Sequence, residues 1–460
     1  MRNTSEIHAE SGGQMDERRA KIQEDIRGLI EGEIRCDDVF LQLYASDASI
    51  YQIPPLGVVR PRSDADVVAC VQYASEKQIP LHARGAGTGL AGESLGPGLV
   101  LDFSKSMRRI LTVKGDRVRV QAGATLLEVN RRLASVGRRF VVDPANGSVT
   151  TMGSVVAVNP AGSRSIRYGQ AGDYVESLKI VTATGETLEV GREPLPGTPN
   201  EPSPGVLRDL VAQTADVLRR YADPIEARRP KARFNRSGYQ LWDLLGPNTL
   251  NVARLLTGSE GTLALVTEAE FRTVPLPSDR VTALFFFDRL DAAARAALEV
   301  RELNPTASDL LDRRLLTLAR DADARYDLLI PPTAEAALLT EFEGGAPGEA
   351  RAQAERVKDL LRARRVWAFD DAIAESDEEM ELYWQLSRLV TPTLNRLKGA
   401  ARPLPFVEDV AVPPETLPTF LVAVQNILKR HHTTASLFAH AGHGQLHMRP
   451  FLDLRRPEDV

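Results

Sequence analysis

The sequence predicts an α+β protein built from more than one domain. Its 460 residues correspond to about three domains at roughly 150 residues each. Strand-like and helix-like segments alternate up to residue 277, and beyond it their order is typical of an antiparallel sheet with helices on one face. Hydrophobic residues make up 43% of the chain and charged residues 26%, so we expect a folded protein without extensive disorder.

The elements expected before residue 140 surround a glycine-rich loop at 84–92. Ser63 and Thr125 each precede an acidic residue by three positions, which is the pattern of a capping box, so each is expected to begin a helix. The expected elements are a helix at 16–34, a turn at 53–57, a helix after Ser63, strands at 81–83, 99–103 and 117–121, and a helix from Thr125 to about 137.

The middle of the chain contains two unusual connections. Residues 143–172 are rich in Gly, Pro, Ser and Asn, and a loop of that length inside a compact domain is usually functional. A second glycine turn lies at 258–262. The other elements expected here are a hairpin of 178–182 with 187–190, a proline-rich linker at 194–204, a helix at 207–221, a strand at 263–267 and a boundary at 274–277.

The last part of the chain is expected to form the antiparallel sheet. Its predicted strands lie at 281–287, 337–343, 365–369, 406–412 and 436–440, and its predicted helices at 290–303, 349–362, 378–390 and 415–429. These patterns divide the chain into a tail and helix (1–52), a first domain (53–277) and a second domain (278–460).

Composition excludes several classes of function. The net charge of −5 argues against a nucleic-acid partner. Two cysteines, Cys36 and Cys70, cannot supply a four-thiolate iron–sulfur cluster, a cysteine-based zinc site or a disulfide framework. No apolar run approaches the roughly 18 residues of a membrane span. We therefore expect a soluble cytoplasmic protein, in contact with the membrane at most through an electron acceptor.

The glycine loop has two interpretations on its residues alone. Residues 87–92 fit the pattern GxGxxG, but a strand follows them where a Rossmann site needs a helix, so a Rossmann site is not expected. The glycines could let backbone N–H groups approach an anion, or they could form an ordinary tight turn.

Four short segments in a fixed order resolve this choice by resemblance. They are VRPRS at 59–63, RGAGTG at 84–89, DPAN at 143–146 and GSEGT at 258–262. Together they resemble the FAD-linked oxidases, whose flavin domain is of the vanillyl-alcohol oxidase and p-cresol methylhydroxylase (PCMH) type. The most similar branch contains D-lactate dehydrogenase (cytochrome), the glycolate oxidase flavin subunit and D-2-hydroxyglutarate dehydrogenase. The resemblance implies a PCMH-type FAD-binding domain of two subdomains at 53–277 and a ferredoxin-like antiparallel substrate (cap) domain at 278–460.

The resemblance also implies which residues contact FAD. The glycine loop would surround the pyrophosphate, and four later segments would line the rest of the groove. The residues implied are Arg84, Gly85, Ala86, Gly87, Thr88, Gly89, Pro144, Ala145, Asn146, Met152, Gly153, Ser154, Asn159, Ala161, Gly162, Glu260, Gly261 and Val266. Family members with covalent FAD carry a histidine in the loop, where this chain has Thr88, so non-covalent FAD is expected.

Histidines gather near the end of the chain. His440, His443 and His447 flank a glycine turn, and from spacing alone they are either metal ligands or surface residues. The resemblance assigns His440 and His447 to a divalent metal, which would be Zn, Mn or Fe. It also suggests Arg388 and Lys398 as partners of a substrate carboxylate, although each could equally be a solvated helix charge.

The function implied is FAD-dependent oxidation of a D-2-hydroxy acid, such as D-lactate, D-2-hydroxyglutarate or glycolate, to the 2-oxo acid. Hydride would pass to flavin N5, and an external acceptor, for instance an iron–sulfur domain or subunit, would take the electrons. Two alternatives are a non-catalytic or split FAD-binding subunit that needs a second chain, and a metal-independent flavin alcohol oxidase.

Family members continue beyond the histidine cluster with a Glu-His pair, and this chain contains no such dipeptide. We therefore expect a C-terminally truncated chain with an incomplete cap domain and an uncovered sheet edge or apolar face.

Overall fold

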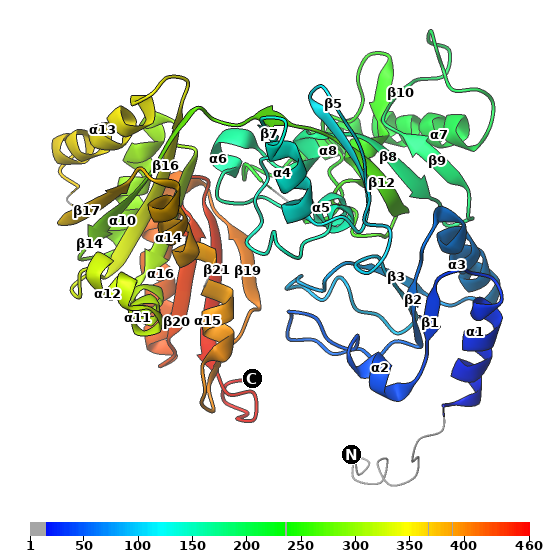
Figure 1. Cartoon of the computed structure of the whole chain (residues 1–460), viewed down its shortest axis with the longest axis horizontal. Helices are drawn as coiled ribbons and strands as arrows, with labels where there is room; N and C mark the ends of the chain where they lie inside the picture. The colour runs from blue at the N-terminus through cyan, green and yellow to red at the C-terminus, as the bar shows by residue number, and fades with distance from the viewer. Residues whose placement is uncertain (1–14, 235–236, 367, 389) are drawn as a thin grey trace.

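The computed structural model describes residues 15–234, 237–366, 368–388 and 390–460. Figure 1 shows two parts side by side, residues 17–275 in blue to green and residues 279–460 in yellow-green to red. We call these the N-terminal part and the C-terminal part. The mixture of helices and sheets agrees with the predicted α+β class.

The N-terminal part begins with a four-stranded sheet of order β1-β2-β4-β3, in which β2, β4 and β3 are parallel. Ser63 caps its longest helix as predicted, because the Ser63 hydroxyl accepts the amide of Asp66 at 3.2 Å. The elements are α1 (Glu17–Arg27), β1 (Glu33–Arg35), α2 (Asp38–Gln42), β2 (Gly57–Arg60), α3 (Asp64–Lys77), β3 (Leu81–Arg84) and β4 (Leu99–Asp102).

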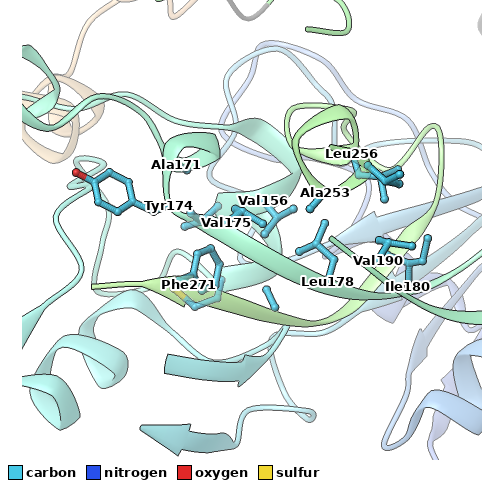
Figure 2. Packing of buried hydrophobic residues seen from close by; sticks show 14 of the residues in the cluster. Val156, Ala171, Tyr174, Val175, Leu178, Ile180, Val190, Ala253, Leu256 and Phe271 are labelled. Atoms are coloured by element: carbon cyan, nitrogen blue, oxygen red, sulfur yellow. The ribbon is translucent and has the colours of Figure 1, made fainter. Parts of the chain in front are cut away.

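A five-stranded antiparallel sheet follows, with the order β5-β6-β12-β8-β9. Its predicted hairpin is confirmed, since β8 pairs with β9 from Leu178–Val190 to Val181–Thr187. Figure 2 shows the core on this sheet, where Leu178, Ile180 and Phe271 pack with residues of neighbouring helices. The strands are β5 (Ile110–Lys114), β6 (Arg117–Gln121), β8 (Val175–Val181), β9 (Thr187–Val190) and β12 (Leu265–Arg272).

The segment predicted as a long loop at 143–172 contains helices. Thr151 caps α5 (Met152–Val158), and Met152, Val155 and Val156 are buried in the core. These apolar contacts stabilise a helix that its glycine- and proline-rich flanks concealed. The remaining elements of the N-terminal part are α4 (Leu126–Ala134), with the predicted capping box at Thr125, β7 (Arg138–Arg139), α6 (Ser165–Tyr168), β10 (Arg192–Pro194), α7 (Val206–Arg220), α8 (Ala222–Ala227), β11 (Thr249–Asn251), α9 (Val252–Leu256) and β13 (Val274–Pro275).

The C-terminal part is one eight-stranded sheet, with the order β17-β14-β16-β15-β20-β21-β18 and β19 paired to β21. It is therefore larger than the expected ferredoxin-like sheet. Strands β15 and β21 escaped the sequence analysis, and the strand expected at 365–369 lies instead at 370–374. The strands are β14 (Asp279–Phe287), β15 (Ala307–Asp312), β16 (Ala336–Gly344), β17 (Asp370–Ala374), β18 (Arg402–Pro403), β19 (Val407–Ala411), β20 (Ala435–His440) and β21 (Gln445–Leu452).

Helices cover both faces of this sheet. On β14, Phe285 packs into a cluster with α10, α13 and α16, whereas Leu284 and Phe286 pack into a second cluster with α11, α12, α14 and α15. The expected uncovered apolar face is therefore not present in the described residues. The helices are α10 (Leu290–Val300), α11 (Arg313–Ala322), α12 (Ala324–Leu329), α13 (Glu349–Ala363), α14 (Asp377–Arg388), α15 (Val390–Arg396) and α16 (Leu417–Arg430). No helix in the described ranges has the length and apolar character needed to cross a membrane.

Candidate functional site

The glycine-rich loop follows β3 and lies against the start of α5. A Cβ atom on Gly85 would come within 2.4 Å of the Ser154 hydroxyl oxygen, and one on Gly87 within 2.4 Å of Arg84 Nη2. Gly87 also has φ +68°, which residues with side chains rarely adopt. Close packing therefore requires both glycines, and the loop presents backbone where other residues would present side chains.

Arg84 lies beneath this loop. Its guanidinium donates to the carbonyl oxygen of Ser46 at 2.9 Å and stacks over the ring of Tyr44 at 5.2 Å. Burial lowers the pKa of Arg84, but an arginine remains charged in a protein. Within the described ranges Arg84 has no carboxylate at ion-pair distance. Arg84 is therefore a buried cation under the glycine loop, bonded to the carbonyl oxygens of Tyr44 and Ser46 and attracted by Asp47, and its charge suits a pyrophosphate bound at the loop.

The second glycine turn closes on the same place from the far end of α5. The amides of Gly258 and Glu260 donate to carbonyls of α5 at 2.8 and 2.9 Å. Glu260 and Gly261 both have positive φ, 52° and 76°, and a Cβ on Gly261 would lie 3.7 Å from Ala83 in β3. Asn159, at the end of α5, is 1% exposed, and its Nδ2 has no hydrogen-bond partner in the described structure. The Asn159 Nδ2 is therefore a buried donor, enclosed by protein, that lacks a partner in the described structure.

The other predicted cofactor residues differ in how they lie relative to the two glycine turns. A Cβ on Gly162 would come within 2.4 Å of the Asp143 carbonyl oxygen, so the segment 144–146 passes beside Ala161 and Gly162. Met152 is fully buried in the core, and its amide donates to Ala124 at 2.8 Å. The amide of Gly153 donates to the carbonyl oxygen of Ala122 at 2.7 Å. The backbone amides of Met152 and Gly153 are therefore already hydrogen-bonded and are not free to donate to a cofactor.

A buried ion pair joins the two parts of the molecule. Arg164, just before α6, makes two parallel bonds to Glu341 of β16, at 2.7 and 2.8 Å, and a third to Asp143 at 2.7 Å. Trp384 of α14 donates to Glu341 at 2.8 Å and stacks on Arg164, with 4.4 Å from Cζ to the ring. Figure 1 shows α6 at the boundary between the two parts. Burial alone would raise the pKa of Glu341, but the positive charge and hydrogen bonds of Arg164 have the larger effect and hold this pKa below its usual value.

The predicted metal ligands lie next to this junction. His440 ends β20, and its Nδ1 is 2.8 Å from Asp309 Oδ1. His447, on β21, has its Nδ1 2.6 Å from Glu408 Oε2. The two imidazole rings are perpendicular, with centroids 5.4 Å apart, and Phe438 packs against both. A carboxylate on Nδ1 is the usual outer partner of a metal-bound histidine, so the donor pair fits part of a metal site.

A complete metal site is not assembled by the described residues, because no group of three or more His, Cys, Asp or Glu is arranged to hold an ion. Arg388 is about half exposed and pairs with Glu381 at 2.5 Å, and Lys398 is exposed. Their proposed role in binding a carboxylate stays a prediction. The sequence analysis missed Asp309, because it lies on the strand β15 that the pattern did not reveal.

Comparisons with known proteins agree with this geometry. Residues 55–191 match a family described as FAD binding domain, and residues 276–460 match the C-terminal domain of FAD linked oxidases. The chain is 30% identical over 441 residues to D-2-hydroxyglutarate dehydrogenase of Pantoea ananatis, covering 90% of this chain and 42% of that protein. It is 29% identical over 429 residues to glycolate oxidase subunit GlcD of Bacillus subtilis, covering 91% and 78%. The chain thus spans less than half the length of the D-2-hydroxyglutarate dehydrogenases that it matches.

Solved structures show the same fold at lower identity. The chain superposes on p-cresol methylhydroxylase with a TM-score of 0.67 at 13% identity, covering 97% of this chain and 85% of that one. The fold is therefore that of the PCMH-type flavin oxidases. Because both domain types are present and match in order along most of its length, the chain belongs to the FAD-linked oxidases.

Proposed function

We propose that the protein oxidises a D-2-hydroxy acid, such as D-lactate, D-2-hydroxyglutarate or glycolate, to the 2-oxo acid with FAD as its cofactor. One observation carries the proposal: His440 and His447 lie at the boundary where the C-terminal part meets the N-terminal part, which contains the FAD-binding domain. Asp309 bonds to His440 and also to Ser163, next to the predicted FAD contact Gly162. Relatives named for 2-hydroxy-acid oxidation support the substrate class.

One set of residues would bind the cofactor, and a second set would bind and orient the substrate. Arg84 and the glycine loop would hold the pyrophosphate non-covalently, and Asn159 would donate to the cofactor from the end of α5. FAD supplies a two-electron acceptor when it is bound. His440 and His447 would orient the hydroxyl and carboxylate of the substrate, either directly or as two ligands of a divalent ion, and Arg388 or Lys398 would approach the carboxylate.

Two domains, 53–277 and 278–460, would carry these roles, and the electrons would pass to an external acceptor. Cys36 precedes the first domain and Cys70 lies in it; both are fully buried, so they offer no cluster ligands to such an acceptor. A cytoplasmic location remains a prediction from composition.

Anaerobic mixing tests the proposal directly. The FAD-loaded protein should lose its flavin absorbance within seconds to minutes on addition of D-lactate, D-2-hydroxyglutarate or glycolate. L-Lactate and L-2-hydroxyglutarate serve as the controls, since glycolate is achiral. A flavin that stays oxidised with all of them would contradict the proposal and favour a non-catalytic or split FAD-binding subunit.

A second candidate is a metal-independent oxidase of alcohols or phenols. The fold similarity to p-cresol methylhydroxylase favours it. The double variant His440→Ala/His447→Ala separates the two candidates. It should reduce flavin bleaching by a D-2-hydroxy acid at least about 100-fold if both imidazoles act on the substrate, whereas an oxidase that does not use them would retain its activity.

A further inference from the structure

Asp309 connects the two parts of the molecule through its two carboxylate oxygens. It is fully buried on β15, and its Oδ1 lies 2.8 Å from His440 Nδ1. Its Oδ2 accepts the hydroxyl proton of Ser163, at 2.5 Å, from the FAD-binding part. The buried side chain of Asp309 therefore contacts both His440, which is proposed to bind the substrate, and Ser163, which follows Gly162.

The chemistry of these bonds specifies the form of the imidazole. An ionised carboxylate only accepts hydrogen bonds, and Ser163 already donates to one of its oxygens. The other oxygen of such a carboxylate pairs with an N–H donor, and in a neutral imidazole that donates through Nδ1 the lone pair stays on Nε2. Nε2 is the nitrogen that a substrate hydroxyl or a metal ion would use.

We propose that Asp309 is a positioning residue that holds His440 as the Nδ1–H tautomer, and that Ser163 ties this arrangement to the FAD-binding part. The proposal rests on the proposed function for its catalytic meaning, and its structural content can be tested without substrate. Asp309 acts through His440, whose Nδ1 it contacts.

The pair of Glu408 and His447 differs from the pair of Asp309 and His440 in where its carboxylate is bonded. Glu408 holds His447 Nδ1 at 2.6 Å, and its other oxygen accepts Nε of Arg449 at 3.0 Å. All three residues of that set lie on β19 and β21 of the C-terminal part. In the described structure, the carboxylate that contacts His440 is thus also bonded to the N-terminal part, whereas the carboxylate that contacts His447 is bonded within the C-terminal part.

The test uses FAD-loaded protein labelled with 15N-histidine, with the His440 signals assigned by their loss in His440→Gln. Long-range 1H–15N correlation should show the Nδ1–H tautomer in the native protein. Asp309→Ala should convert His440 to a mixture containing Nε2–H. A native His440 in the Nε2–H form, or an Asp309→Ala spectrum like the native one, would overturn the proposal.

Two hydroxyl variants test the connection across the boundary. Ser163→Ala should retain the tautomer but increase the exchange of the Nδ1 proton with water about fivefold or more, because the carboxylate loses its second anchor. Ser308→Ala is the matched control. Ser308 precedes Asp309 in the chain, and its buried hydroxyl has no hydrogen-bond partner within the described ranges. Equal exchange in the two variants would refute the role of Ser163.

Activity gives an independent reading of the same idea. Asp309→Ala should slow flavin reduction by the substrate about 10- to 100-fold, while the FAD content stays within about twofold of native. An unchanged reduction rate would refute the positioning role. If no D-2-hydroxy acid reduces the native flavin, the proposed function fails, and the NMR result still decides the role of Asp309.

Discussion

Removing the charge of Glu341 should destabilise the protein strongly. The Glu341 side chain is fully buried, and the side chain of Arg164, which it binds through two parallel bonds, is only 10% exposed. Glu341→Gln keeps the shape and one acceptor but leaves the Arg164 guanidinium with Asp143 as its only carboxylate among the described residues. Breaking a buried pair by removing one partner costs about 3–5 kcal/mol, because the remaining charge stays without compensation.

Urea unfolding followed by tryptophan fluorescence measures this loss, and Trp384 lies against the pair. The control is Asp216→Asn, which removes the charge of a pair with Arg220 whose side chains are 64% and 65% exposed. That change should cost less than about 0.5 kcal/mol. A loss under about 1 kcal/mol for Glu341→Gln would refute the reasoning, because it would mean that water or another group compensates Arg164.

A double variant separates the interaction from the desolvation. Arg164→Met combined with Glu341→Leu removes both charges and keeps apolar volume. We expect it to be more stable than Glu341→Gln alone, because replacing a buried pair by apolar residues is often neutral. Strict additivity of the single losses would show that the two side chains do not act as a unit.

The other predictions concern the glycine loop, a buried acid and the thiols. Gly87→Ala should weaken FAD loading, because its Cβ would lie 2.4 Å from Arg84 Nη2 and displace the guanidinium under the loop. Gly115→Ala, also at positive φ but with nothing within 4 Å, should load normally. Equal flavin absorbance of the two variants after reconstitution would contradict this. Burial raises the pKa of Asp312 from 3.8 to about 6, above its unfolded value, so the folded state binds the proton more tightly and stability should fall by about 3 kcal/mol as the pH rises from about 4 to about 6. Asp312→Asn should flatten this slope in unfolding curves measured across that range, and an unchanged slope would assign it to other groups. Burial raises the pKa of Cys36 to about 11 and of Cys70 to about 12, so Ellman's reagent at pH 8 should detect both thiols only after unfolding, and rapid labelling of the native protein would be inconsistent with their burial.

The sequence predicted the elements whose local signals agree with their packing. Thr125 and Glu128 form the expected capping box, and the hairpin of β8 and β9 lies where its turn residues placed it. The glycine loop, the second glycine turn and the histidine pair were located by their unusual residues at short spacing. Their roles came from the resemblance to the FAD-linked oxidases and stay predictions, because their residues alone left two interpretations open.

Features that depend on distant contacts were missed. α5 is stabilised by core contacts of Met152 and Val155, which its glycine-rich flanks do not reveal. Strand β15 contains Asp309, which is fully buried, and Asp312, which is half-buried, and both interrupt an apolar pattern. Asp312 caps α11 through the nearby amide of Leu315, but His440 and Ser163, the partners of Asp309, lie 131 and 146 residues away, so only the folded structure shows why the charge of Asp309 can be buried.

The ion pair of Arg164 and Glu341 has a consequence for how the two parts align. An apolar contact tolerates small sliding, because its free energy follows the area buried and not the exact direction of approach. The parallel bonds of a guanidinium and a carboxylate tolerate little, since a displacement of about 1 Å breaks both and leaves two charges without water. The boundary therefore admits one register, and the distance from the histidines to the FAD-binding segment is set by geometry rather than by the strength of attraction.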